Sequence, residues 1–429
     1  MLATLRNAWR TPEIRSKMLF TLLILVLYRF GAVIPVPYVS SDTLTQIMNQ
    51  ASGSIFDYLN ILSGQAFSQA TLFALSVSPY ITSSIVMQLL TIAIPALEKL
   101  QKSGEEGRKK ITQITRYVTV GLALITAYGY YMWMRNNNVL TNRGVFAGVV
   151  IIACYVAGSA LIMWLAEKIN EHGIGNGVSM ILFANIVAGG TNLVAMLWSY
   201  ITSGSIGYII LAIGVVVVGL AIIVLAVFVT NSERRIPIQY AKKVVGRKMY
   251  GGQSTNLPIK LNMSGVMPII FANSIVALPS TIALLFPTPA EGSFWANLLN
   301  FLGYSSWFYA LMFLILIIAF AYFYTAISFN PIEVANNLKK NGGFIPGIRP
   351  GKPTSDYITR VLNRITLIGA LFLGFIAVFP LVVNLCSGSM LGSIAFGGSS
   401  LLIVIGVALE TYREIEAQMT MRHYKGFLE

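Results

Sequence analysis

Side chains that could make or break bonds are scarce in this chain, and those present lack the partners that catalysis needs. Its two histidines, His172 and His423, both lie outside the apolar runs. No run holds a serine–histidine pair, an HExxH motif or paired aspartates, so the groups for intramembrane proteolysis are missing. Pro346 and Pro353 stand where a phosphate-binding loop would need glycine and Ser or Thr. The sequence therefore predicts a protein that is not an enzyme and has no catalytic residues, cofactor or metal site.

Acidic side chains are absent from the middle of the apolar runs. Glu167 and Glu410 fall at run ends, whereas proton-coupled carriers typically place such groups within the bilayer. Proton coupling is therefore not expected, although sodium coupling through neutral oxygens remains open. Arg29 does lie within a run, and its long side chain could extend outward to the membrane surface. Cys154 and Cys386 have no CxxC neighbour, so no redox or metal motif is expected.

Neutral polar side chains do occur within the runs, and the run 71–94 is the richest in them. It contains Ser76, Ser78, Thr82, Ser83, Ser84, Gln88 and Thr91. The runs 178–201, 264–286 and 394–410 are also rich in Ser, Thr, Asn and Gly. For any one such run, close packing between helices is an equally good explanation. Four of them in one chain favour helices that surround an aqueous path.

The elements that position these residues are ten apolar runs, each long enough to cross a bilayer. Of the 429 residues, 55% are hydrophobic and only 11% are charged. The predicted spans are 18–36, 71–94, 117–134, 145–166, 178–201, 206–229, 264–286, 307–329, 365–385 and 394–410. Alternate gaps between the runs hold 27 of the 30 Lys and Arg residues, and the other gaps hold two. This is the positive-inside pattern, so we expect an all-α polytopic membrane protein with both termini in the cytoplasm.

Ten spans divide into two sets of five, which we assign to residues 1–202 and 203–429. A half with an odd number of spans ends on the opposite side from its start, so a repeat would have to be inverted. One short apolar segment, residues 54–64, fits neither half as a span. It starts with a capping box, continues with helical spacing and ends at a glycine, through Ser54, Ile55, Phe56, Asp57, Leu59, Leu62 and Gly64. About nine residues cannot cross the bilayer, so it either lies in the interface or re-enters the protein.

Two long cytoplasmic loops, 231–262 and 330–364, are basic and rich in Gly and Pro. The net charge of +14 is concentrated on this side. Such loops follow from the topology rule and from attraction to anionic lipid. Arg247, Lys248 and Arg349 also have the chemistry to bind acidic groups or phosphate. Both interpretations remain open from the residues alone.

Several stretches of this sequence resemble the SecY family, the channel subunits of the bacterial protein translocase. They are Pro79–Thr82 with Gln88–Thr91 (PYIT and QLLT), 173–177 (GIGNG), 253–255 (QST), 343–351 (GFIPGIRPG) and 396–403 (FGGSSLLI). The resemblance extends across essentially all ten spans. It implies two inverted five-helix halves around an hourglass pore, with a short re-entrant plug helix at residues 54–64.

The resemblance also implies roles for particular residues. The pore ring would be Val77, Ile81, Val178, Leu182, Ile270 and Ile403. The plug would use Ile55, Phe56, Leu59, Leu62 and Gly64, and the lateral gate Thr82, Gln88, Ser274 and Leu278. Arg247, Lys248 and Arg349 would contact a motor or a ribosome. From the residues alone, all six ring positions are aliphatic, and each of the pairs 77/81 and 178/182 shares one helix face.

The expected function is a passive protein-conducting channel of the bacterial plasma membrane. It would translocate unfolded secretory polypeptides and release hydrophobic segments laterally into lipid. The resemblance implies SecE and SecG as small membrane subunits, the motor ATPase SecA, the ribosome, signal sequences and anionic lipid as partners. A sodium-coupled carrier of small solutes and a non-conducting scaffold are the alternatives. The carrier would need a cluster of ligands in the middle of the membrane.

Overall fold

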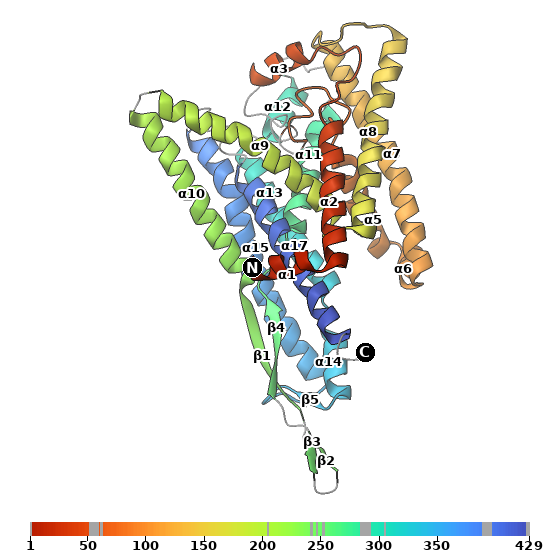
Figure 1. Ribbon diagram of the computed structural model, residues 1–429, viewed down its shortest axis with the longest axis vertical. Helices are drawn as coiled ribbons and strands as arrows, with labels where there is room; N and C mark the ends of the chain where they lie inside the picture. Colours follow the sequence, from red (N-terminus) through yellow and green to blue (C-terminus); the bar gives the residue numbers. More distant parts are fainter. Residues whose placement is uncertain are drawn as a thin grey trace.

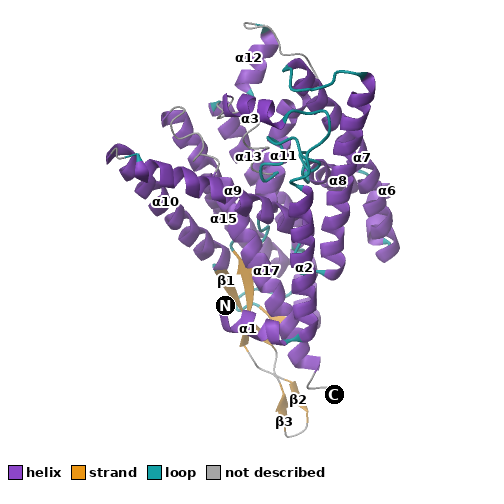
Figure 2. Cartoon of the chain, turned by 45° about the horizontal axis from the view of Figure 1, so that its top comes forward, coloured by secondary structure: helices purple, strands orange, loops and turns teal. Residues whose placement is uncertain are grey.

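The computed structural model is an elongated bundle of helices with its β-structure at one end (Figures 1 and 2). It describes residues 2–50, 60, 63–203, 206–240, 243–245, 248–250, 254–283, 293–303, 306–387 and 397–425. The amino-terminal helices are α1 (Leu2–Arg10), α2 (Pro12–Gly31), α3 (Ser41–Gln50), α5 (Ser78–Ala93), α6 (Pro95–Lys102), α7 (Glu105–Asn136), α8 (Val145–His172) and α9 (Gly177–Thr202).

The remaining helices alternate with the strands. They are α10 (Ile206–Asn231), α11 (Met267–Ala283), α12 (Phe294–Phe301), α13 (Trp307–Ser328), α14 (Pro331–Lys340), α15 (Lys352–Ser387) and α17 (Gly397–Lys425). The strands are β1 (Glu233–Tyr240), β2 (Lys243–Val245), β3 (Lys248–Tyr250), β4 (Ser254–Lys260) and β5 (Gly343–Phe344). Ten of these helices overlap the ten predicted spans in order, so the protein is a mostly helical membrane protein.

Local sequence signals account for many helix starts. Prolines occupy the first turn of α2, α5, α6 and α14, where their missing N–H costs nothing. Asn176 caps α9, since its side chain accepts hydrogen bonds from the N–H groups of Val178 and Ser179. Ser306 and Asn330 cap α13 and α14 in the same way. Helix α5 ends at Ala93, and the chain bends by 101° at Ile94 into α6.

Five helices in the described part of the chain are long and apolar enough to cross a membrane unaided: α8, α9, α10, α13 with its continuation to Lys340, and α15 up to Val383. The bent pair α5 and α6 would make a sixth, and α11 is a shorter apolar helix. The other long helices that match predicted spans, α2, α7 and α17, are less apolar over their length.

Two predicted spans extend five residues or more beyond the end of the observed helix. The second span was predicted from residue 71, but α5 begins only at Ser78, because Ser76 has a φ of 51° that a right-handed helix does not allow. The first span was predicted to reach residue 36, whereas α2 ends at Gly31. Beyond it, Pro35 forms an antiparallel bridge with Thr71.

A small sheet forms where the sequence analysis expected only turn-rich loops. Strand β1 pairs in antiparallel fashion with β4 on one side and with the short β5 on the other, and β2 pairs with β3 beyond them. Ile236, Ile238 and Ile259 turn inward and pack on Ile358 of α15. Figure 2 shows this β-structure at the end of the bundle opposite α3 and α12. The sheet gives the second basic loop, around residue 349, a folded support.

Buried apolar side chains form two main clusters in the bundle. The larger one joins α2, α5, α8, α9, α10, α11, α13, α15 and α17. The second lies between α3, α7, α8 and the segment 63–77, and it is rich in aromatic rings such as Tyr130, Tyr155 and Phe67. The predicted plug residues Ile55, Phe56, Leu59 and Leu62 lie outside the described residues, whereas Gly64 is described.

Candidate pore constriction and seam

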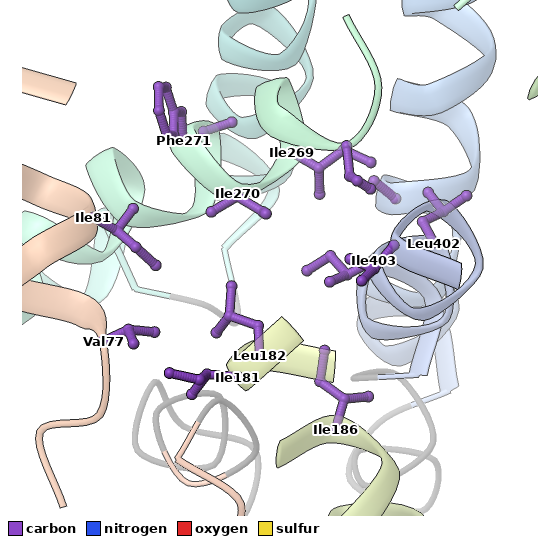
Figure 3. Close-up of a cluster of buried hydrophobic side chains, with 14 of the residues drawn as sticks. Val77, Ile81, Ile181, Leu182, Ile186, Ile269, Ile270, Phe271, Leu402 and Ile403 are labelled. Carbon is purple, nitrogen blue, oxygen red and sulfur yellow. The ribbon is translucent and has the colours of Figure 1, made fainter. Parts of the chain in front are cut away.

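The six residues predicted to line a pore lie together in the larger cluster. Val77, Ile81, Leu182, Ile270 and Ile403 are at most 5% exposed, and Val178 is half-buried and packs against them. Figure 3 shows Val77, Ile81, Leu182, Ile270 and Ile403 approaching a common centre from α9, α11, α17 and the start of α5. Side chains from the two proposed halves of the chain therefore meet in one aliphatic group, which we call the constriction.

The constriction offers water and ions nothing to bind. All six side chains are aliphatic, and Ile181, Ile269 and Leu402 extend the apolar surface around them. A narrow apolar passage of this kind excludes ions by dewetting, while an apolar or extended polypeptide can separate its walls. The arrangement suits a seal that yields to a chain and holds back small ions.

One face of the constriction adjoins the segment 63–77, a run of tight turns that leads into α5. Its shape is fixed by hydrogen bonds. The N–H of Phe67 donates to Ser63 Oγ at 3.0 Å, the N–H of Ser68 donates to Asn60 Oδ1 at 3.0 Å, and the Tyr130 hydroxyl of α7 donates to the Phe67 carbonyl at 2.7 Å. The segment is therefore held by side chains, including one from a distant helix.

Polar groups of α2 and α9 contact both ends of this segment. Asn185 Nδ2 of α9 donates to Ser76 Oγ at 3.3 Å, and Arg29 Nη1 of α2 donates to the Gly64 carbonyl at 3.4 Å. From the sequence, Arg29 could extend outward to the membrane surface, and no role was predicted for it. The structure instead directs its half-buried guanidinium toward the segment, because a carbonyl within reach satisfies an N–H that lipid cannot.

Four residues were predicted to line a lateral gate between α5 and α11, which contact each other. Thr82 and Ser274 donate to carbonyls of their own helices, at Ser78 and Ile270, and Leu278 is half-buried. Gln88 differs, because it accepts a hydrogen bond that links α5 to α13.

The Tyr324 hydroxyl of α13 donates to Gln88 Oε1 at 2.7 Å. Tyr324 also packs its ring on Phe271 of α11, with ring centroids 5.1 Å apart, and on Phe323. Tyr324 was not predicted from the sequence, although it is one of three tyrosines within the very apolar run 307–329. We call the contact region of α5 with α11 and α13 the front seam.

A cavity of about 390 Å³ lies beside the constriction, between the carboxyl ends of α10 and α13, the start of α11, and residues within α15 and α17. Its walls include apolar side chains such as Leu402 and Ile405 and the charged groups Lys260, Glu410 and Arg413. Burial, and secondarily the charge of Arg413, lowers the pKa of the Lys260 ammonium. The cavity passes from an apolar wall at the constriction to a charged wall near the sheet.

Two of the three predicted docking residues, Lys248 and Arg349, lie at the end of the molecule that carries the sheet. Arg349 is exposed on the loop after β5, and its carbonyl accepts a hydrogen bond from Thr354 Oγ1 at 2.8 Å. Gly347 supports the loop with a φ of +82°, which favours glycine. Lys248 belongs to β3, and Arg247 lies outside the described residues.

Comparisons with known proteins agree over nearly the whole chain. The SecY family model matches residues 71–412. The chain is 43% identical, over 441 aligned residues covering 100% of both chains, to the protein translocase subunit SecY of Streptomyces galbus. The same identity holds over 449 aligned residues, again 100% of both, for the protein of that description from Mycobacterium bovis.

Solved structures share the fold at lower sequence identity. "The structure of a protein conducting channel" gives a TM-score of 0.64 at 18% identity, and one describing how the plug domain of SecY stabilises the closed channel gives 0.63 at 18%. Each comparison covers 94% of this chain and 92% of the other. Sec61 in the canine ribosome–channel complex gives 0.60 at 16% identity, with the same coverage.

Proposed function

Because this chain belongs to the SecY family and is a protein-conducting channel subunit of the translocase rather than an enzyme, we propose that the constriction is its pore ring. The ring consists of Val77, Ile81, Val178, Leu182, Ile270 and Ile403. One observation supports this assignment above others. Six aliphatic side chains from four separate parts of the chain gather in one apolar group, in which five are buried and Val178 is half-buried.

The ring works as a passive seal. At rest, its side chains touch, and the absence of polar ligands makes the passage costly for ions. A translocating polypeptide supplies its own apolar and backbone groups and separates the ring. The work comes from outside the chain, through a partner that pushes the polypeptide or through its synthesis.

Measuring ion conductance in planar bilayers tests the ring. Ile81→Gly combined with Ile403→Gly removes two side chains from the seal, so resting conductance should rise well above that of the unchanged protein. Ile151→Gly is the matched control, because Ile151 is equally buried but belongs to the second cluster. An unchanged current in the double variant would remove these residues from the constriction.

Residues 54–64 form the plug in this proposal. The support is the short apolar pattern of Ile55, Phe56, Leu59 and Leu62, and the position of Gly64, which joins the segment beside the constriction. Deleting residues 56–62 should raise ion leak through the purified protein. A deletion that left the leak at its resting value would argue against a plug.

The front seam is the proposed lateral gate, lined by Thr82, Gln88, Ser274 and Leu278 with the added Tyr324. An apolar signal sequence entering between α5 and α11 would replace the contacts that now close the seam. Residues 1–202 and 203–429 would be the two inverted halves that separate there. In this proposal the protein spans the bacterial plasma membrane with both termini in the cytoplasm.

The sheet end of the molecule is the proposed docking face. Arg247, Lys248 and Arg349 would contact the motor ATPase SecA or ribosomal RNA phosphates, and the solved canine Sec61 relative is a ribosome–channel complex. SecE and SecG would be the small membrane subunits. Arg349→Glu should impair motor-driven secretion while the protein still inserts. Normal secretion by that variant would contradict a docking role for this loop.

A further inference from the structure

Arg29 is a charged residue that the proposed function leaves without a task. It lies in the last turn of α2, within a predicted span, and is half-buried. A guanidinium inside a membrane protein is costly unless its N–H groups find acceptors. The contact given by the structure is with the Gly64 carbonyl, 35 positions away in the chain, at 3.4 Å.

Gly64 is closely enclosed at this contact. Its φ is +62°, and a Cβ added there would lie 2.6 Å from Arg29 Nη1 and 3.0 Å from Asn185 Oδ1. Any side chain would therefore displace the guanidinium or the amide. The position thus needs glycine both for its backbone conformation and for the approach of α2 and α9.

The contact continues directly to the constriction. Asn185 lies one helical turn beyond the ring residue Leu182 on α9, and its amide donates to Ser76 Oγ at 3.3 Å. Ser76 in turn precedes the ring residue Val77, and its own φ of 51° is strained for serine. Both ends of the segment 63–77 are therefore tied by polar groups to helices that bear or adjoin the ring.

We propose that Arg29 is a positioning residue that favours the closed channel. By holding the Gly64 carbonyl, it fixes the segment 63–77, and the segment fixes Val77 at the constriction with the help of Asn185. The inference rests on the proposed pore ring. It adds that the closed state is stabilised by a charge-assisted hydrogen bond outside the ring, which must break before the segment can move aside.

The first test is resting conductance in planar bilayers. Arg29→Met removes the donor while keeping an unbranched apolar stem, so the open fraction should rise about tenfold, as expected for one hydrogen bond to a charged group. Arg29→Lys keeps a charged donor and should restore part of the closure. Arg135→Met is the matched control, because Arg135 is an exposed arginine at the end of α7. Its conductance should stay at the resting value.

The second test breaks the same contact from its other side. Gly64→Ala should also raise conductance, and Arg29→Met combined with Gly64→Ala should conduct no more than the larger single variant. Independent, multiplying effects would overturn the inference, as would Arg29→Lys conducting as much as Arg29→Met. The unfolding temperature of each purified variant shows whether its fold is intact. A variant that conducts more but unfolds at the normal temperature has a displaced segment and not a damaged fold. If the Arg29→Met protein does not accumulate, the resting conductance of Gly64→Ala tests the inference by itself.

Failure of this inference differs from failure of the proposed function. Ile81→Gly combined with Ile403→Gly could raise conductance while Arg29→Met and Gly64→Ala stay at the resting value. The assignment of the ring would then hold, and the role of Arg29 would be wrong. If none of them conducts, the ring itself is wrong and the inference falls with it.

Discussion

Arg116 and Glu167 form the ion pair that joins α7 to α8. The guanidinium contacts the carboxylate twice, with Nε to Oε1 at 2.9 Å and Nη2 to Oε2 at 2.7 Å. The Glu167 side chain is 9% exposed and that of Arg116 is 45% exposed, so solvent screens one partner. Tyr80 of α5 lies near the pair, which places it at the junction of three helices of the amino-terminal half.

Removing the carboxylate charge should weaken this junction. We expect Glu167→Gln to lower the free energy of unfolding by about 1–2 kcal/mol, because the side chain loses its negative charge and one of the two oxygens that accept from Arg116 becomes an NH2 group. Thermal unfolding of the purified protein measures the effect. Glu171→Gln is the control, since its bond to Lys168 lies on the surface, and it should leave the unfolding temperature unchanged. Equal effects of the two variants would count against a structural role for the pair.

The Tyr324 hydroxyl provides a test of the front seam. Tyr324→Phe keeps the ring packed on Phe271 but removes the hydroxyl that donates to Gln88. Losing one hydrogen bond of about 1 kcal/mol should make the seam roughly fivefold easier to open. The measurement is the export of a precursor whose signal sequence has been weakened, and export should increase.

The matched control for this prediction is Tyr322→Phe. Tyr322 lies on the same helix, two positions away, but its hydroxyl donates to the Asn363 carbonyl of α15 at 3.1 Å, outside the seam. Its removal should leave export of the weakened precursor unchanged. An increase of the same size in both variants would mean that the hydroxyl acts through general stability and not through the seam.

At the scale of elements, the β1–β4 hairpin is a folded unit with its own small core. Ile259 of β4 is fully buried there among Ile236, Ile238 and Ile358. Ile259→Ser should destabilise this unit by about 3 kcal/mol, since it removes buried apolar volume and adds a hydroxyl. Motor-driven secretion should fall while resting conductance stays low, because the constriction belongs to another cluster.

Asn256→Ala on the same strand provides the comparison for Ile259→Ser. Asn256 is exposed, and its loss removes no buried contact. Secretion should remain normal in this variant. Increased ion leak in Ile259→Ser would show instead that the sheet and the constriction are mechanically linked, which the separate clusters do not suggest.

The elements also show what the sequence could and could not predict. Apolar length and alternating charge predicted helices in all ten places, because those signals are local. The segment 63–77 escaped prediction, since its turns depend on distant groups such as the Tyr130 hydroxyl and Arg29. The hairpin escaped because Gly and Pro were given more weight than the alternation of Ile236 and Ile238. The six ring residues were predicted by resemblance, since spacing alone could relate only those on one helix.

At the scale of the whole molecule, the two proposed halves meet along two seams. The front seam joins α5 to α11 and α13. The second, which we call the rear seam, joins α9 and the turn before it to α17. There the Gly175 N–H donates to Glu414 Oε2 at 2.9 Å, and the Thr411 hydroxyl contacts Met180 Sδ at 3.5 Å. Helix α1 packs on α17 nearby, through Ala8 and Ile415.

The two seams differ in what holds them. The front seam is held by aromatic ring contacts and by the Gln88–Tyr324 hydrogen bond. An entering apolar helix could replace these contacts with its own. The rear seam carries a backbone-to-carboxylate bond, and it lies in the same half of α9 as the ring residues Val178 and Leu182. The boundary between the halves in the sequence, at residue 202, is the opposite end of α9. We therefore expect the halves to pivot at the rear and separate at the front.

Cross-linking tests this asymmetry. Paired cysteines at Gln88 and Tyr324, joined by a bismaleimide spacer, should block export, because a polypeptide could no longer open the front seam. Paired cysteines at Met180 and Thr411, joined by the same spacer, should leave most export intact, because a pivot keeps its two sides together. Each pair without the spacer serves as its own control for the substitutions. Equal inhibition by both cross-links would show that the halves move apart along their whole contact, and export despite the front cross-link would mean that the channel opens without this seam.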